Sequence, residues 1–189
     1  AKAWRTVRLG DVIRLFSGGT PSRSKSEYWG GNIKWLSIPD IANANGGYVY
    51  NSAERITEEG LEHSPARVVP KDTIVISARG TVGKLAMLAE PMAFNQSCYG
   101  IKAKEELGLN QRYLFYALKN VIKSAKRLAH GGVFDTFTTD TFDQIDISYP
   151  AIETQKRIAG VLAAFDEKIE NNNRIIKTLE EIAQAIFKK

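Results

Sequence analysis

The sequence from Pro150 to Lys189 reads PAIETQKRIAGVLAAFDEKIENNNRIIKTLEEIAQAIFKK. Apolar side chains recur along it at alternating spacings of four and three residues, which is typical of a helix in a coiled coil. We call the repeating positions the heptad seam: Ile158, Leu162, Phe165, Ile169, Asn172, Ile176, Leu179, Ala183 and Ile186. No Gly or Pro follows Gly160, so the pattern predicts a single helix of about 50 Å.

The heptad seam also predicts a partner for this helix, because a compact core cannot cover a stripe so long and narrow. The sequence contains no second copy of the helix, so we expect pairing between molecules, most simply as a homodimer. Ile175 and Ile182 widen the stripe, which favours packing on more than one neighbour. Asn172 is a polar residue in the seam and is expected to fix the register of the pair. The alternative is a helix that folds back along its own domain.

Before Pro150, short apolar segments separated by turn residues predict strands. Residues 73–78 and 84–89 are two such segments, and a turn with two glycines separates them. Residues 30–38, 47–50 and 94–104 are three more. Their spacing favours a mixed or antiparallel sheet over repeated strand–helix–strand units.

Two helices are predicted between the strands. Thr57 is a favourable N-cap for the first, at 57–62. Asn110 is expected to cap the second, which the pair Gly131 and Gly132 would end. The second helix has an apolar stripe of Leu114, Leu118, Val121, Ile122, Ala125 and Leu128, and an outer face with Lys119, Lys123, Lys126 and Arg127. We interpret that basic face as solvent-exposed. The chain is thus predicted to be an α+β protein, with a mixed or antiparallel-sheet domain at 1–150 and a helical region at 151–189.

Composition excludes several classes of protein. Of the 189 residues, 43% are hydrophobic and 25% are charged, which is the balance of a folded globular protein. The longest apolar run is about seven residues, too short to cross a bilayer, and no signal peptide is recognisable at the start. Cys98 is the single cysteine, so an internal disulfide is excluded and a zinc site lacks ligands. We expect a cytoplasmic protein without a metal and without contact with membranes.

The net charge is compatible with nucleic acid as a partner. Lys and Arg number 26 against 21 Asp and Glu, which gives a formal charge of +5. The excess lies before Pro150. Such a charge suits a DNA-binding protein, although many other proteins reach it.

Motifs for catalysis are incomplete. The segment Gly80–Lys84 is similar to part of a phosphate-binding loop, but residue 78 is Ala where the first glycine is needed. Residue 85 is Leu where Ser or Thr would hold magnesium. A Cys–His nucleophile would require Cys98 with His63 or His130, and neither histidine has a supporting sequence context.

A group of acidic residues is the remaining candidate for catalysis. It consists of Asp135, Asp140, Asp143 and Asp146, and a metal-dependent nuclease needs such a cluster. The pair Thr139 and Asp140, however, is typical of a helix cap, and Asp146 alternates with apolar neighbours as on the solvent face of a strand. We predict no catalytic site and no metal site, so the chain is not expected to be an enzyme.

The predicted loops are rich in side chains that bind DNA. Arg pairs with guanine, Asn and Gln pair with adenine, and Ser, Thr and Lys bind phosphates. By chemistry and loop placement, the candidate DNA-binding residues are Arg23, Lys25, Asn43, Asn45, Arg79, Thr81, Lys84, Asn95 and Gln96. The alternative for each is a role in loop structure: the asparagines can form turns, and Asn95 with Gln96 can cap a strand.

A series of motifs along the chain resembles one known family. They are GGTPS at 18–22, YWGG at 28–31 with IKW at 33–35, Asp40, ITEEGL at 56–61, SARGTVG at 77–83, NQ at 95–96 and PAIETQKRI at 150–158. In this order, and over nearly the whole chain, they resemble the specificity subunit of type I restriction–modification enzymes. Of these motifs, Gly18–Pro21 and Tyr28–Gly31 are expected to hold the fold and not to contact bases.

The resemblance implies a function in DNA recognition. Such a subunit reads a two-part DNA site with two target recognition domains, which two long antiparallel helices join. It recruits modification subunits that bind S-adenosylmethionine and methylate adenine, and restriction subunits that cut DNA with ATP. The resemblance therefore implies that this chain has no catalytic residues and no cofactor of its own.

One departure from the family pattern affects the expected assembly. The chain has one recognition domain and one helical region where a full specificity subunit has two of each. It is either a natural half-subunit or a fragment, and we favour a half-subunit that pairs as a homodimer. A two-fold dimer would read a palindromic interrupted target. A different function remains as the alternative, a protein-binding scaffold that uses the C-terminal helix.

Overall fold

A five-stranded sheet forms the centre of the molecule in the computed structural model, which describes residues 4–44, 47–128 and 136–187. Its strand order is β2-β9-β6-β7-β4. The bounds are Ile13–Ser17 for β2, Cys98–Ala103 for β9, Ile74–Ser77 for β6, Leu85–Leu88 for β7 and Tyr48–Val49 for β4. Neighbouring strands are antiparallel except β4 and β7, which are parallel. The sheet is therefore mixed, as predicted.

Strands β6 and β7 lie in the middle of this sheet and are buried along their whole length. Successive side chains point to opposite faces of a strand. Ile74 and Ile76 accordingly join one hydrophobic core, while Val75 joins a second core on the other face. Burial on both faces explains why these two strands are continuous apolar runs in the sequence.

Two smaller sheets complete the strand arrangement. One has the order β5-β3-β8, with bounds Glu54–Ile56, Trp29–Leu36 and Ala93–Phe94. The other pairs β1 (Arg5–Arg8) with β10 (Asp146–Tyr149), in antiparallel register from Arg5 opposite Tyr149 to Arg8 opposite Asp146. This second pair joins the start of the described chain to the segment that leads into the last helix.

Short helices connect the strands, and one longer helix covers the central sheet. The short ones are α1 (Leu9–Val12), η1 (Ser26–Tyr28), α2 (Ile38–Asn43), α3 (Glu58–Glu62), η2 (Glu105–Leu107) and α5 (Thr139–Gln144). The longer helix α4 (Gln111–Leu128) packs Leu114, Leu118 and Ile122 into the first core. The side-chain oxygen of Asn110 accepts a hydrogen bond of 3.0 Å from the backbone N–H of Tyr113, as predicted for the cap.

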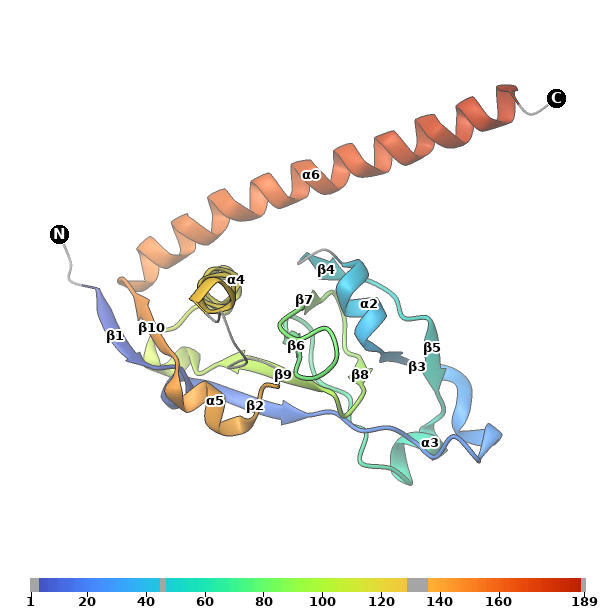
Figure 1. The fold of residues 1–189 in the computed structure, drawn as a ribbon, viewed down its shortest axis with the longest axis horizontal. Helices are drawn as coiled ribbons and strands as arrows, with labels where there is room; N and C mark the ends of the chain where they lie inside the picture. Colours follow the sequence, from blue (N-terminus) through green and yellow to red (C-terminus); the bar gives the residue numbers. More distant parts are fainter. Residues whose placement is uncertain (1–3, 45–46, 129–135, 188–189) are drawn as a thin grey trace.

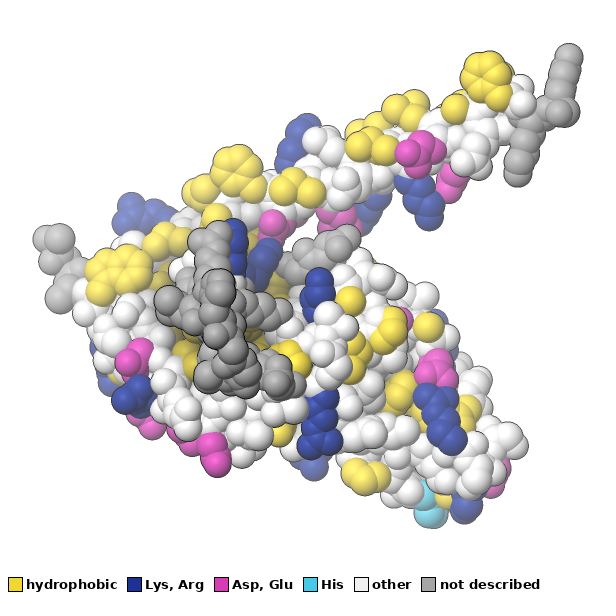
Figure 2. Space-filling model, in the orientation of Figure 1, with side chains coloured by type: hydrophobic (Ala, Val, Ile, Leu, Met, Phe, Trp, Pro, Cys, Tyr) yellow, Lys and Arg dark blue, Asp and Glu magenta, His cyan; other side chains and the backbone are white. Residues whose placement is uncertain are grey.

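The last helix, α6 (Ile152–Phe187), leaves the body of the molecule and extends past it (Figure 1). Gln155 and Ala159, in its first turns, are buried, whereas every residue from 171 to 187 is exposed. Apolar side chains form a row along the side of α6 that faces away from the body (Figure 2). The expected α+β architecture with one long C-terminal helix is confirmed.

Several element bounds differ from those predicted. Residues 94–104 form two strands, because the side chain and carbonyl of Asn95 accept hydrogen bonds from the backbone N–H groups of Ser97 and Cys98 and make a turn between them. Only Tyr48–Val49 of 47–50 is a strand. The cap of α5 is Thr138 in place of Thr139. Strands β1, β2 and β5 were not predicted, and the residues Gly131 and Gly132 lie outside the described chain.

Candidate nucleic-acid interface

The loop between β6 and β7 carries three of the predicted DNA-binding residues, Arg79, Thr81 and Lys84, and all three are exposed. Gly80 and Gly83 have φ angles of +69° and +74°, a backbone conformation that glycine adopts at little cost. The loop has a positive φ angle at these two positions, and this accounts for the two glycines in the motif.

Buried Ser77 holds the base of this loop. Its hydroxyl group donates a 2.5 Å hydrogen bond to the carbonyl oxygen of Thr81 and accepts a 2.9 Å hydrogen bond from the backbone N–H of Lys84. The backbone N–H of Gly83 also donates to the carbonyl oxygen of Ser77. The loop is therefore fixed by bonds at both ends while its cationic side chains point into solvent.

The turn between β8 and β9 lies beside this loop. The backbone N–H of Ala78 donates a 2.8 Å hydrogen bond to the carbonyl oxygen of Ser97. Asn95 is half-buried, and its side-chain oxygen accepts from the N–H of Ser97 at 3.1 Å, so this side chain shapes the turn. Gln96 is exposed, and its side-chain oxygen accepts a hydrogen bond from the hydroxyl of Thr20.

The loop after β2 completes this surface. The backbone N–H of Gly19 donates a 2.9 Å hydrogen bond to the carbonyl oxygen of Phe94. A Cβ atom on Gly18 would lie 2.0 Å from the backbone oxygen of Asn95, so only glycine allows the two segments to approach so closely. We call residues 18–20, 78–84 and 95–97 the loop cluster. It brings together Arg79, Thr81, Lys84, Asn95 and Gln96 of the predicted set.

Arg79 and Lys84 have no acidic partner among the described residues, in contrast to Arg8, Arg14 and Arg23. Arg8 lies 3.0 Å from a carboxylate oxygen of Asp146, and Arg14 lies 2.5 Å from one of Glu106. Exposed cations without a partner attract phosphate. The loop cluster thus presents two exposed cations without an acidic partner among the described residues.

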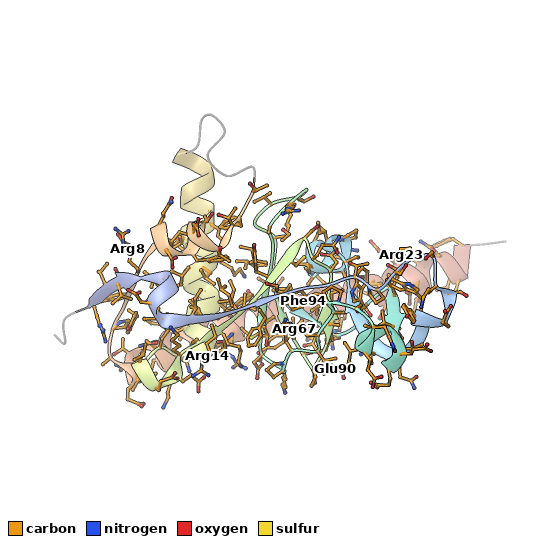
Figure 3. All side chains as sticks on the ribbon, turned by 90° about the horizontal axis from the view of Figure 1, so that it is seen from below. Arg8, Arg14, Arg23, Arg67, Glu90 and Phe94 are labelled. Carbon is orange, nitrogen blue, oxygen red and sulfur yellow. The ribbon has the colours of Figure 1, made fainter. Side chains whose placement is uncertain are left out.

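Arg23 has an intramolecular role instead. Its guanidinium group hydrogen-bonds to both carboxylate oxygens of Glu54 and stacks on Trp29, 3.7 Å from the ring centroid. This hydrogen bonding raises the pKa of Arg23 and lowers the pKa of Glu54. Figure 3 shows Arg23 at one end of the molecule, with Arg8 and Arg14 at the other end and Phe94 between them. Arg23 is therefore not part of the loop cluster.

The remaining predicted residues also lie elsewhere. The Nζ of Lys25 donates a 2.8 Å hydrogen bond to the hydroxyl of Tyr28 in η1. Asn43, at the end of α2, lines a crevice of about 300 Å³ between β4, α4 and α6. Asn45 lies outside the described residues. The set predicted from the sequence thus divides between one assembled surface and three separate positions.

Most of the heptad seam is exposed. Phe165, Ile169 and Leu179 have 65%, 57% and 59% of their surface accessible. Ile158 differs, because it packs against the first core of its own domain. The exposed part of the seam consequently starts at Leu162, which is 38% accessible.

The described residues contain no group of three His, Cys, Asp or Glu that could hold a metal ion. Cys98 is buried, and burial raises the pKa of its thiol to about 12, so it is not a nucleophile at neutral pH. His130 and Asp135 lie outside the described residues. Among the helices that the structure describes, none has the length and apolar character needed to cross a membrane.

Sequence reasoning missed the polar residues that position these elements. Ser77, Gln111 and Gln155 are buried polar side chains with hydrogen bonds to distant backbone groups. Ser77 and Gln155 lie in the motifs SARGTVG and PAIETQKRI, but a motif does not indicate which of its polar side chains are buried. Their partners become visible only when the chain has folded.

The sequence matches one family of known proteins over nearly its whole length. Residues 1–181 match the family model described as the type I restriction modification DNA specificity domain. The chain is 34% identical over 189 residues to the type I restriction enzyme MjaIX specificity subunit of Methanocaldococcus jannaschii, covering 99% of this chain and 43% of that protein. It is 27% identical to the HindI specificity subunit of Haemophilus influenzae, covering 98% of this chain and 40% of that protein.

Solved structures share the fold. A type I restriction-modification S subunit from M. genitalium superposes with a TM-score of 0.67 at 18% identity, covering 95% of this chain and 43% of the other. The HsdS subunit from Thermoanaerobacter tengcongensis gives a TM-score of 0.63 at 19% identity, covering 91% and 39%. The chain therefore spans about two fifths of the length of the relatives that it matches.

Proposed function

Because this chain belongs to the family of type I restriction modification DNA specificity domains, we propose that it recognises one half of a two-part DNA target. In this proposal residues 1–150 form the target recognition domain and residues 151–189 form the helix that spaces and pairs two such domains. The chain contributes recognition and no catalytic group. A cytoplasmic location goes with the proposal, since the target is the DNA of the cell.

The observation that carries the proposal is the pair of exposed, unpartnered cations on a rigidly held loop. Arg79 and Lys84 flank the two glycines of the β6–β7 loop, and no described acid neutralises either of them. A guanidinium group can read guanine through two hydrogen bonds, and an ammonium group binds phosphate. A fixed loop loses little conformational entropy on binding. Gln96, on the adjoining turn, adds an amide that can pair with adenine.

A second copy of the chain is the proposed partner of α6. The exposed seam from Leu162 to Ile186 is the support for this assignment, because apolar side chains in such a row gain free energy when another helix covers them. Modification and restriction subunits are the further proposed partners. S-adenosylmethionine and ATP would be bound by those subunits.

The salt dependence of binding to DNA duplexes tests the proposal. Phosphate contacts release counterions, so the logarithm of the association constant should fall linearly with the logarithm of the salt concentration. Fluorescence anisotropy of labelled random-sequence duplexes, titrated at several salt concentrations, measures this slope. An absence of binding at low salt, or a binding constant that salt leaves unchanged, would contradict the proposal and favour a protein-binding scaffold.

A further inference from the structure

Gln155, in the first turns of α6, is fully buried and makes three hydrogen bonds that join this helix to the domain. Its side-chain oxygen accepts from the backbone N–H of Asn110 at 2.8 Å. Its Nε2 group donates to the carbonyl oxygens of Gly108 and Pro150, each at 2.8 Å. Both hydrogens of the amide group are used. One side chain thus connects the turn before α4, the residue after β10 and α6 itself.

Two further contacts set the direction of α6 against α4. Ala159 is buried one turn after Gln155, and its small side chain lets the helix lie close to the domain. Farther along, Lys119 Nζ of α4 lies 3.5 Å from a carboxylate oxygen of Asp166. Asp166 is half-buried, whereas the helix after residue 170 is exposed. The joint between α4 and α6 is therefore confined to about three turns.

A small rotation at this joint produces a large displacement at the far side of the recognition domain. A domain of about 150 residues has a radius of about 20 Å. A tilt of about 10° at Gln155 therefore moves a point about 20 Å to the side of the helix by about 3.5 Å along the helix direction. Successive base pairs are about 3.4 Å apart along the DNA axis. The two domains of a two-fold pair move in opposite directions, so such a tilt changes their separation by at least one base pair.

We propose that Gln155 is a positioning residue that fixes the angle between α6 and the recognition domain, and that this angle selects the length of the gap between the two half-sites. The first part of this proposal, that Gln155 fixes the helix angle, concerns this chain alone. The second part, that the angle selects the gap length, rests on the proposed function. Gln155 is fully buried, so its side chain is not available to contact a base. Its effect on DNA binding would appear in the gap and not in the sequence of the half-sites.

A distance measurement tests the first part without DNA. Spin labels on Lys71→Cys, in the domain, and Thr178→Cys, on α6, report the angle of the helix, and unlabelled protein is added so that only distances within one chain are read. Both positions are exposed, and buried Cys98 does not react. Gln155→Met removes all three hydrogen bonds with little change in volume. We expect one narrow distribution of the distance between the two labels when Gln155 is present, and a broad distribution in the Gln155→Met variant.

Gln111 provides the matched control. It is also a buried glutamine with three hydrogen bonds, to the N–H of Ala103 and the carbonyl oxygens of Asp72 and Ile101, but all of these lie within the domain. Gln111→Met should lower the stability and leave the distance distribution narrow. Equal distributions in the Gln155→Met variant and the unsubstituted protein would overturn the proposal. If Gln155→Met does not fold, Gln155→Asn, which keeps the amide on a shorter side chain, is used with the same criteria.

The gap between half-sites tests the second part. Bound sequences are selected from random DNA duplexes by the unsubstituted chain and by the Gln155 variant. We expect the same half-sites from both, with one gap length for the unsubstituted chain and several for the variant. An unchanged single gap in a variant whose helix angle is broadened would overturn this part. If the unsubstituted chain selects no DNA, the proposed function fails, while the distance measurement still decides the role of Gln155.

Discussion

The hydroxyl group of Ser77 accepts a 2.9 Å hydrogen bond from the backbone N–H of Lys84, and the two residues thereby close the loop that carries Arg79. Ser77 belongs to a fully buried strand, so the loop is anchored in the central sheet. The position of the cationic side chains in the loop cluster thus depends on one buried hydroxyl.

Replacing Ser77 by Ala should loosen this loop. The Lys84 N–H and the Thr81 carbonyl oxygen would lose their partner, and hydrogen bonds of this kind contribute about 0.5–1.5 kcal/mol each. We expect reduced stability in urea unfolding and weaker DNA binding. Ser24→Ala, at an exposed position in the loop after β2, is the control and should change neither quantity. Full DNA affinity in a destabilised Ser77→Ala variant would show that the loop does not contact DNA.

Arg79 and Lys84 should affect DNA binding in different ways. Arg79→Ala removes a group that can read a base, and we expect it to relax the preference at one position by about 1–3 kcal/mol. Lys84→Ala should weaken binding to all sequences equally and reduce the salt slope by about one. Lys71→Ala, an exposed lysine at the opposite end of β6, serves as the control. An unchanged preference in the Arg79 variant would exclude Arg79 from base recognition.

Charges in the heptad seam should separate the proposed dimer. Replacing Leu162 and Ile169 together by Asp would bury two carboxylates in each helix of the pair, at a high cost in free energy. We expect folded monomers in analytical ultracentrifugation. Thr178→Asp, outside the seam on the same helix, should leave the dimer intact. A monomer before any substitution would contradict pairing between two copies of the chain.

The ion pair between Arg23 and Glu54 should make part of the stability depend on pH. Hydrogen bonds from Arg23 lower the pKa of the Glu54 carboxyl below its ordinary value of 4.5. A carboxyl group with a lowered pKa stabilises the folded state above its ordinary pKa, and this contribution is lost as the pH falls through the lowered value. Urea unfolding of the unsubstituted protein and of Glu54→Gln should therefore differ at neutral pH and converge in acid. Equal differences at both pH values would exclude this ion pair as their source.

The parts of the fold that the sequence predicts are those with local, periodic signals. Ile74–Ser77 and Leu85–Leu88 are recognisable because both faces are buried, and α4 because Asn110 caps an apolar stripe. The strand Arg5–Arg8 is short and largely exposed, and its partner strand starts only at Asp146. The alternation around Asp146 indicates a strand, but nothing in either segment indicates that the two pair.

In the candidate site, too, local features are predictable from the sequence and distant contacts are not. Loop placement identifies Arg79 and Lys84 as accessible, because glycines mark the turn between two strands. The role of Arg23 is invisible in the sequence, since its partner Glu54 is 31 residues away. The contact between Thr20 and Gln96 spans 76 residues. Tertiary contacts therefore decide which of the polar loop residues share one surface.

Selection of bound sequences from a pool of random DNA duplexes tests the central claim most directly. The purified chain is used alone and together with the modification subunit of its own host. We expect enrichment of one short sequence that occurs twice in inverted orientation with a fixed gap, and loss of that enrichment in the Arg79→Ala variant. A pool that shows no enriched sequence under either condition would contradict recognition of DNA by this chain.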